Sequence, residues 1–243
     1  YLFELNDNYS INSIFVIPKF IAELYVKNQI DSVDLGQKLE INYNVHTGDT
    51  DFCSQINRGV ENCDTEWFSI FEIDDEYKPI WLKSMNDYMK ENPEVDVFLP
   101  IVVDVDDKLV FAGFTNEATF ANNFSQESGI LTNDTLHQYQ NFQISGMVFS
   151  KEKFLELGGL KSNLKLTFGY ELFLRLTYNS VKIMTIPRIG YKHMNLREGS
   201  IFWNYKNGKN VLTDNEVKFW IDTAKKEYFF TNDREIKYEE TNS

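Results

Sequence analysis

The chain has 243 residues, of which 42% are hydrophobic and 15% aromatic, and its formal net charge is -13 at pH 7. This length is enough for one full hydrophobic core, so we expect a single domain over residues 1–243. The negative charge disfavours a nucleic-acid partner, because a phosphate backbone would be repelled over most of the surface. No apolar run of about 18 residues and no signal-peptide pattern occurs, so we expect no membrane span and a cytoplasmic location.

Hydrophobic periodicity and turn residues predict an alternation of strands and helices. In chain order, the pattern predicts strand 11–18, helix 18–28, strand 39–45, helix 49–62, strand 66–73, helix 79–92, strand 95–105, a hairpin strand 108–114, strand 141–150, helix 151–157, helix 169–179, strand 181–187 and helix 213–228. The polar stretch 115–138 is longer than most loops that only connect two secondary-structure elements, which indicates a functional loop. Such an alternation is typical of an α/β fold with a mostly parallel, twisted sheet, which binds ligands at the carboxyl ends of its strands.

Residues that favour helix ends support several of these boundaries. Pro79 stands at the first turn of one helix, and Asp49 is a candidate N-cap of another. The glycines at 158–159 are expected to close the short helix before them. Thr213 and Glu216 have the spacing of a capping box and predict the start of the C-terminal helix.

Three carboxylates follow the apolar strand 66–73, namely Glu72, Asp74 and Asp75. In an extended strand Glu72 and Asp74 project to the same side, because side chains alternate with period two. With no lysine or arginine between them, the two charges repel each other unless they share a proton or a cation. Carboxylate oxygens suit Mg²⁺ or Mn²⁺, so the pattern predicts a divalent metal site. The alternative is an ordinary acidic turn that precedes the helix at Pro79.

Two segments resemble inverting GT-A glycosyltransferases of the family 2 type. The segment "INRGVENCDTEWFSIFEIDDEYKPIWLKSMNDYM" is similar to that family's Asn-x-Gly helix, hydrophobic strand, Asp-x-Asp-Asp motif and proline-led helix. The segment "ISGMVFSKEKFLELGGLKSNLKLTFGYELFLRLTYNSVKIMTIP" resembles its acceptor-side region. The resemblance covers about residues 39–197, and it leaves 1–38 as a divergent or truncated start and 200–243 as a C-terminal extension. It implies a single GT-A (Rossmann-like) domain.

The resemblance assigns roles to residues of both segments. Glu72 and Asp74 stand where the family binds its metal, and Asp75 would support that site or contact the sugar. Asn57, in the Asn-x-Gly turn, would lie near the nucleotide, and Gly146 would let a sugar approach a strand end.

Two basic residues further along the chain are candidates for the site: His193 lies where many relatives place a histidine or an arginine near the diphosphate, and Arg197 follows four residues later. His193 would be a further metal ligand, although a lone histidine is more often a structural hydrogen-bonding residue. Arg197 would clamp a phosphate, and its alternative is a solvated surface arginine.

The family's general base is an Asp in a Glu-Asp pair, and this sequence has Phe168 and Gly169 there. The nearest acid, Glu171, is therefore the candidate base, unless it only favours the helix N-terminus or pairs with Arg175. The resemblance implies metal-dependent, inverting transfer from a nucleoside-diphosphate sugar of the UDP or GDP type to a glycan, lipid or protein acceptor. The alternative is a catalytically degenerate binding or assembly protein that keeps the fold.

Overall fold

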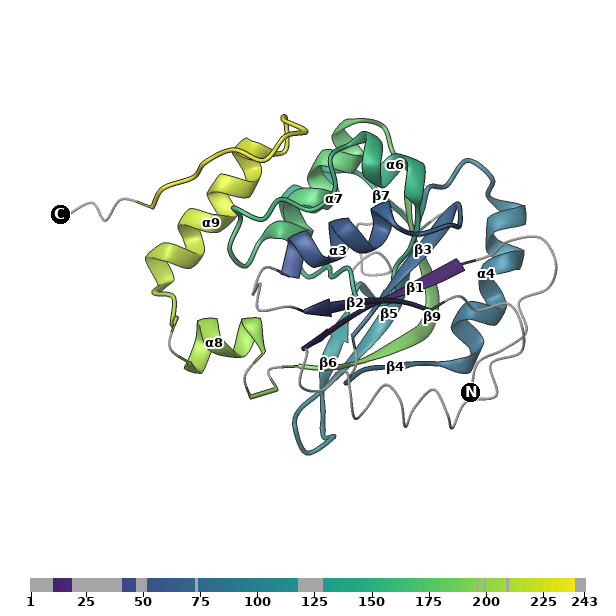
Figure 1. The fold of residues 1–243 in the computed structure, drawn as a ribbon, viewed down its shortest axis with the longest axis horizontal. Coiled ribbons are helices and arrows are strands. Elements are labelled where there is room, and N and C mark those ends of the chain that lie inside the picture. Colours follow the sequence, from purple (N-terminus) through teal and green to yellow (C-terminus); the bar gives the residue numbers. More distant parts are fainter. Residues whose placement is uncertain are drawn as a thin grey trace.

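The computed structural model describes residues 11–18, 41–46, 52–72, 74–117, 129–195, 197–198, 200–208 and 210–238, which form one mixed sheet with helices on both faces (Figure 1). The strands are β1 (Ile11–Pro18), β2 (Ile41–His46), β3 (Trp67–Phe71), β4 (Glu76–Tyr77), β5 (Val97–Val105), β6 (Phe111–Thr115), β7 (Ile130–Leu131), β8 (Val148–Ser150) and β9 (Ile183–Met194). Their order is β2-β1-β3-β8-β5-β9-β4, with β6 paired to β5 and β7 paired to β9.

Strand direction explains where a site can form. β1 pairs in parallel with β2 and β3, and β5 pairs in parallel with β9. The short β8 runs antiparallel to both β3 and β5, so these two strands point the same way. The strands β1, β2, β3, β5 and β9 therefore present their carboxyl ends at one edge, which is where α/β sheets bind ligands.

The helices are α3 (Phe52–Glu61), α4 (Pro79–Glu91), α5 (Asn133–Gln138), α6 (Lys151–Glu156), α7 (Phe168–Tyr178), α8 (Ile201–Asn207) and α9 (Asp214–Glu227). α3 packs on β1 and β2, α4 packs on β9, and α9 packs on α7. Figure 1 shows α4 at one end of the molecule and α8 and α9 at the other. Within the described residues, no helix is both long enough and apolar enough to cross a membrane.

Two buried clusters cover the two faces of the sheet. Val97 and Leu99 belong to the larger cluster, which includes side chains of α3, α6 and α7. Phe98 between them belongs to the smaller cluster, with Trp81 and Met85 of α4. Because neighbouring strand residues point to opposite faces, a nearly continuous apolar run such as β5 serves both clusters at once.

Most of the expected helix ends are confirmed. Thr213 and Glu216 form a reciprocal capping box at the start of α9, and Pro79 is in the first turn of α4. The glycines at 158–159 both have positive φ and follow α6. Pro18, the first residue of the expected helix 18–28, is the last residue of β1. The rest of that helix and the expected N-cap Asp49 lie outside the described residues, whose first helix is α3.

The expected strand 141–150 is wrong over most of its length, because only β8 is a strand. Gly146 has φ of +72°, and the Met147 N–H closes a turn onto the carbonyl of Ile144. The Gly146 N–H donates instead to the carbonyl of Ile70 in β3. Segment 139–147 is thus a loop without regular secondary structure, and its Gly146 contacts the end of β3.

Two further differences concern length. β9 continues to Met194, well past the expected end at Pro187, because register shifts accommodate extra residues opposite β5. The stretch 115–138 contains the short β7 and α5 among its described residues, and α8 was not expected from the sequence.

Candidate functional site

Two carboxylates of one turn and a histidine from a distant strand meet at the carboxyl edge of the sheet. One potential ligand atom from each of Glu72, Asp75 and His193 lies within 4.8 Å of the others. Glu72 directly follows β3, and Asp75 directly precedes β4. β4 pairs with the end of β9, where Glu76 faces Lys192 across the ladder, and this pairing brings Asp75 to His193.

Hydrogen bonds from neighbouring segments hold the two carboxylates. Ser145 Oγ donates to Glu72 Oε1 at 2.9 Å, and the Glu72 N–H donates to the Tyr191 hydroxyl at 3.0 Å. Asp75 Oδ1 accepts the N–H of Met194 at 2.8 Å. Asp75 Oδ2 is buried, and no residue that the structure describes donates a hydrogen bond to it. A buried carboxylate oxygen without a partner is costly, so this atom is the strongest sign that the cluster is built to hold a ligand.

The electrostatics of the cluster point the same way. Burial, together with the charge of Glu72, raises the pKa of Asp75 from 3.8 to about 7. Burial lowers the pKa of His193, but the hydrogen bond to Asp104 and the nearby charges of Glu72 and Asp75 outweigh it and raise that pKa to about 9. With this pKa, His193 is protonated at neutral pH in the metal-free protein, and its positive charge balances part of the negative charge of the two carboxylates. A divalent metal would replace that proton, and two carboxylates with one imidazole are ligands that it accepts.

Asp74 does not join this cluster. Its Oδ2 accepts a hydrogen bond from Arg197 Nε at 2.5 Å, in an ion pair that is partly exposed. The expectation that Glu72 and Asp74 share one side rested on extended backbone, and this is wrong: β3 ends at Phe71, and the Asp75 N–H donates to the Glu72 carbonyl at 3.0 Å. In such a turn period two no longer applies, so Asp75 takes the place expected for Asp74.

Glu171 lies far from the role expected of it. Its side chain has no exposed surface, and it accepts from Lys161 at 2.8 Å and from Arg175 at 3.0 Å. Both carboxylate oxygens are therefore occupied inside the core, and the group has no path to an acceptor. We therefore set aside the expectation that Glu171 is the base, and the alternative pairing with Arg175 is the one that the structure contains.

Asn57 and Gly146 have structural contacts. The Asn57 side chain donates to the carbonyl of Leu160 and accepts its N–H, both at 2.8 Å, which joins α3 to the glycine turn after α6. A Cβ on Gly146 would lie 2.5 Å from a ring carbon of Tyr191, so this position needs glycine for packing as well as for its positive φ. Trp81 Nε1 also donates to the Gly146 carbonyl at 2.8 Å.

Sequence reasoning missed residues that support the cluster, above all Asp104 and Tyr191. Asp104 is 6% exposed and contacts His193, and Tyr191 is fully buried under Glu72. A signal was present for Asp104, since an acid in an otherwise apolar strand near its carboxyl end is unusual. Tyr191 carried no such signal.

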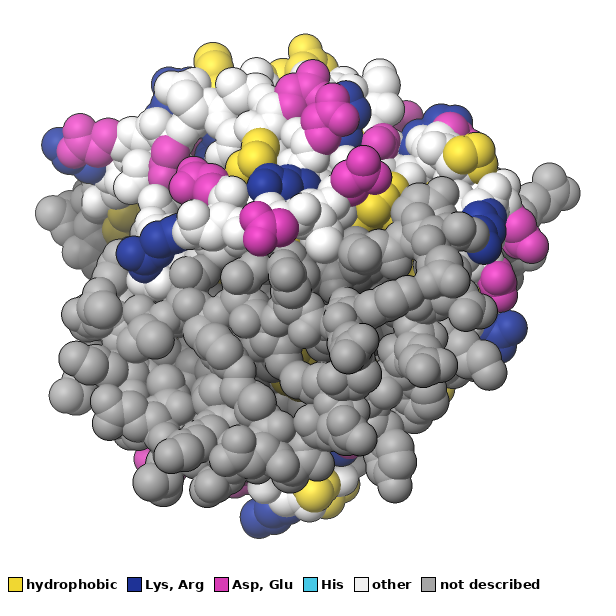
Figure 2. All heavy atoms as spheres, turned by 45° about the vertical axis from the view of Figure 1, so that its right-hand side comes forward, with side chains coloured by type: hydrophobic (Ala, Val, Ile, Leu, Met, Phe, Trp, Pro, Cys, Tyr) yellow, Lys and Arg dark blue, Asp and Glu magenta, His cyan; other side chains and the backbone are white. Residues whose placement is uncertain are grey.

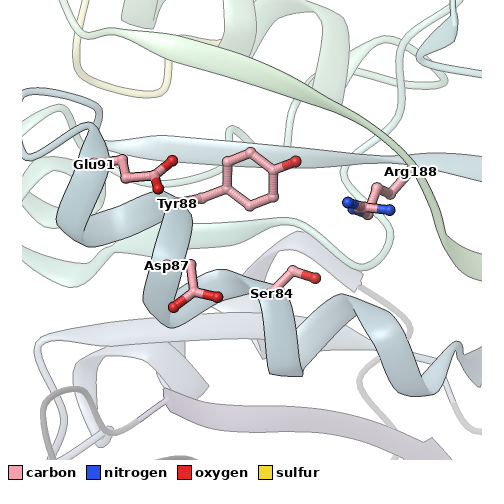
Figure 3. Close-up of a pocket in the computed structure, with 5 residues that line it drawn as sticks. All are labelled: Ser84, Asp87, Tyr88, Glu91 and Arg188. Carbon is pink, nitrogen blue, oxygen red and sulfur yellow. The ribbon is translucent and has the colours of Figure 1, made fainter.

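A separate shallow groove lies between α4 and β9. Figure 3 shows Arg188 approaching from β9, opposite Tyr88 and Glu91 of α4. Ser84 and Asp87 complete its lining. The groove shares no residue with the Glu72 cluster.

The surface view adds one observation about charge. On the face in Figure 2, the acidic and basic side chains of the described residues are interspersed. Among the coloured residues of that face there is no broad basic patch of the kind that binds nucleic acid.

A mixed α/β sheet with an acidic turn at the carboxyl end of a central strand is the arrangement of a GT-A domain. The profile of "Glycosyl transferase family 2" matches residues 24–152, more than half of the chain, and the chain belongs to this family. No curated protein sequence matches the chain.

Solved structures agree on the fold. One similar structure is S. aureus TarS 1–349 in complex with UDP-GlcNAc, at a TM-score of 0.56 and 14% identity. It matches over 80% of this chain and 60% of that chain. TarS 1–349 without the ligand matches at a TM-score of 0.52 and 13% identity, over 76% of this chain and 60% of that one. The chain thus spans less than two thirds of these relatives' length.

Proposed function

We propose that the protein transfers a sugar from a nucleoside-diphosphate sugar to an acceptor, with a divalent cation at Glu72, Asp75 and His193. The observation that carries this is the buried Asp75 Oδ2, which has no hydrogen-bond partner among the described residues and lies beside two other potential ligands. Family membership supports the reaction class. We further propose that residues 1–243 form a single domain, as the packing of α9 on α7 favours.

The residues present fit such a cation. Glu72 and Asp75 supply the hard oxygens that Mg²⁺ and Mn²⁺ prefer, and His193 adds a nitrogen, which favours manganese over magnesium. A bound cation would stabilise the negative charge of the departing diphosphate, which is worth several kcal/mol. Ser145 and Tyr191 contribute by holding Glu72 in place before any ligand arrives. An inverting outcome remains part of the proposal, on the resemblance alone.

We propose that nucleotide binding breaks the ion pair between Asp74 and Arg197. Arg197 lies on the connection after β9, and its side chain is 40% exposed. A diphosphate offers this guanidinium a stronger partner than one carboxylate, because it carries more charge and more acceptor oxygens. Asp74 is then free to turn toward the cation. Asn57 and Gly146 take no direct part in the proposed reaction, since their contacts are structural.

A second candidate function is nucleotide-sugar binding without catalysis. The observation that favours it is the lack of a carboxylate at Phe168 and Gly169, together with the burial of Glu171. Transfer needs a group that accepts the acceptor's proton, worth about a hundred- to ten-thousandfold in rate. Donor hydrolysis and transfer assays separate the two functions, since a binder would take up nucleotide sugar and release it intact.

The proposed function predicts that manganese and a nucleoside diphosphate together stabilise the folded protein. At about 100 times the Kd, the pair should add about 3 kcal/mol to the free energy of unfolding, or about 5–10 °C in Tm. Glu72→Gln should remove most of this shift, because it takes one anionic ligand from the site. Differential scanning fluorimetry with UDP, GDP and their sugars is the measurement, with UDP-GlcNAc as first donor because a similar structure contains it.

Glu66→Gln is the matched control, since Glu66 is an exposed glutamate just before β3. It should keep the full shift. If no nucleotide diphosphate changes Tm with manganese present, or if the two variants behave alike, the proposed site is wrong.

Arg197→Ala should separate cation binding from nucleotide binding. Without its partner, Asp74 is freed, so manganese alone should bind at least as well as in the parent. UDP with manganese should bind about tenfold more weakly, because a charge-assisted contact to phosphate is lost. Isothermal titration calorimetry measures both affinities. Arg188→Ala, which removes an exposed arginine of β9, is the control and should change neither. Weaker manganese binding in Arg197→Ala would contradict the proposed exchange of partners.

A further inference from the structure

Asp104 is a buried carboxylate next to the Glu72 cluster, and the proposed function so far gives it no part. It lies on β5 beside His193 of β9 in the sheet register. Register partners project to the same face of a sheet, so the two side chains meet. Asp104 Oδ1 is 2.9 Å from His193 Nδ1, and the Asp104 residue is 6% exposed.

The other contacts of Asp104 determine which of the two groups carries the hydrogen. Thr115 Oγ1 donates to Asp104 Oδ2 at 2.5 Å, and Gln143 Nε2 donates to Oδ1 at 3.4 Å. A carboxylate that receives hydrogen bonds from a hydroxyl and an amide acts as an acceptor throughout. The Nδ1 atom of His193 is therefore the donor in its contact with Asp104.

We propose that Asp104 is a positioning residue for His193. By accepting the Nδ1–H, it keeps Nε2 free of hydrogen in the neutral ring, so Nε2 is the nitrogen that His193 can offer to a cation beside Glu72 and Asp75. That Nε2 then meets a cation rests on the proposed function, whereas the ring orientation does not.

The surroundings of Asp104 are rigid enough for this task. Asn116 is fully buried with φ of +67°, and its Oδ1 accepts the Gln143 N–H at 2.9 Å. Its Nδ2 donates to the carbonyl of Pro100 at 2.9 Å, which attaches segment 139–147 to β5. Gln143 and Thr115 thus approach Asp104 from two elements, so the carboxylate has little freedom to rotate away from His193.

The first test uses the parent protein without metal. Long-range ¹H–¹⁵N correlation spectra of protein with ¹⁵N-labelled histidine are recorded at increasing pH until the imidazole is neutral. They show which ring nitrogen retains its hydrogen. We expect Nδ1 for His193. Retention on Nε2 would overturn the proposal. This measurement needs neither manganese nor nucleotide, so it stands even where the proposed function fails.

The second test compares two variants that remove hydrogen bonds around the same carboxylate. Asp104→Asn changes the atom that faces His193, and Thr115→Val removes only the donor to Oδ2. Manganese affinity, followed by electron paramagnetic resonance of the free ion, should fall about 10–100-fold in Asp104→Asn. Thr115→Val should stay close to the parent, although both variants lose stability. Equal losses of affinity would mean that Asp104 is only structural and would overturn the proposal. If the parent binds no manganese, the proposed function fails, and the spectra alone decide on Asp104.

Discussion

Glu171→Gln is expected to lower the free energy of unfolding by about 3–5 kcal/mol, with a fall in Tm of about 10 °C. Glu171 is the only carboxylate side chain that contacts the buried Lys161 and Arg175 within the described residues. Each of these cations is at most 1% exposed. Removing the anion leaves two buried positive charges with only carbonyl oxygens as partners, which is the costly half of a broken buried pair.

The loss should reach well beyond the pair itself. Arg175 also donates to the carbonyl of Gly159 at 2.7 Å, and Lys161 donates to the carbonyl of Glu227 at 2.7 Å. The cluster thus joins α7, the glycine turn and the end of α9. Urea unfolding followed by circular dichroism measures the change. Glu152→Gln on α6, an exposed glutamate, is the control and should stay within about 0.5 kcal/mol of the parent.

The Glu171→Gln variant also tests whether Glu171 is the general base. A catalytic Glu171 would show lost transfer with unchanged stability. The structure predicts instead that the free energy of unfolding falls, and that any transfer activity decreases only in proportion to the fraction of folded protein. A stable, inactive Glu171→Gln protein would restore the interpretation that the sequence suggested.

Asp75→Asn is expected to stabilise the metal-free protein while it abolishes the manganese-dependent shift. The carboxylate of Asp75 is half-buried beside Glu72, and one of its oxygens has no hydrogen-bond partner within the described part of the chain. An amide keeps an oxygen for the Met194 N–H and removes the repulsion from Glu72. Above pH 7 the gain should be about 1–3 kcal/mol, since the variant avoids the cost of a partly buried charge beside Glu72.

The pH dependence of this gain has a defined sign. The pKa of Asp75 is raised from 3.8 to about 7 on folding, so below 3.8 the carboxyl is protonated in both states and its charge costs nothing. As pH rises from 3.8 to about 7, the unfolded chain ionises first and the parent loses stability. The advantage of Asp75→Asn should therefore be small at pH 4 and full at pH 8. Asp107→Asn, at the exposed turn before β6, should show no such trend. An advantage that shrinks as pH rises would contradict the assigned shift.

Much of the fold could be predicted from local patterns. Pro79 and the Thr213–Glu216 box specify helix starts through contacts a few residues apart, and the structure confirms them. β5 was recognisable because its run of apolar residues is too long and too β-branched for a loop. Segment 139–147 was not, because its apolar residues resemble a strand while Gly146 and the donors around it impose a turn.

The candidate site divides in the same way. Glu72 and Asp75 were recognised as candidates from their types and positions, and His193 from the family resemblance, and the three residues meet in the structure. Their assignment went wrong at Asp74, because one hydrogen bond from Asp75 to Glu72 ends the strand earlier than the apolar pattern suggests. Glu171 was misjudged because its spacing from Arg175 permits an ion pair but does not show that Lys161, from the turn before α7, contacts the same carboxylate inside the core.

The sequence by itself determined the alternation of elements, the carboxylates after β3 and the family to which the chain belongs, since all of these depend on residues close together in the chain. Only the tertiary structure decided which carboxylate faces the histidine, which is held by an arginine, and which is enclosed in the core. These outcomes depend on strand register and on contacts between residues up to 123 positions apart, as between Asp74 and Arg197. Such contacts are set by how whole elements pack, and no local pattern encodes them.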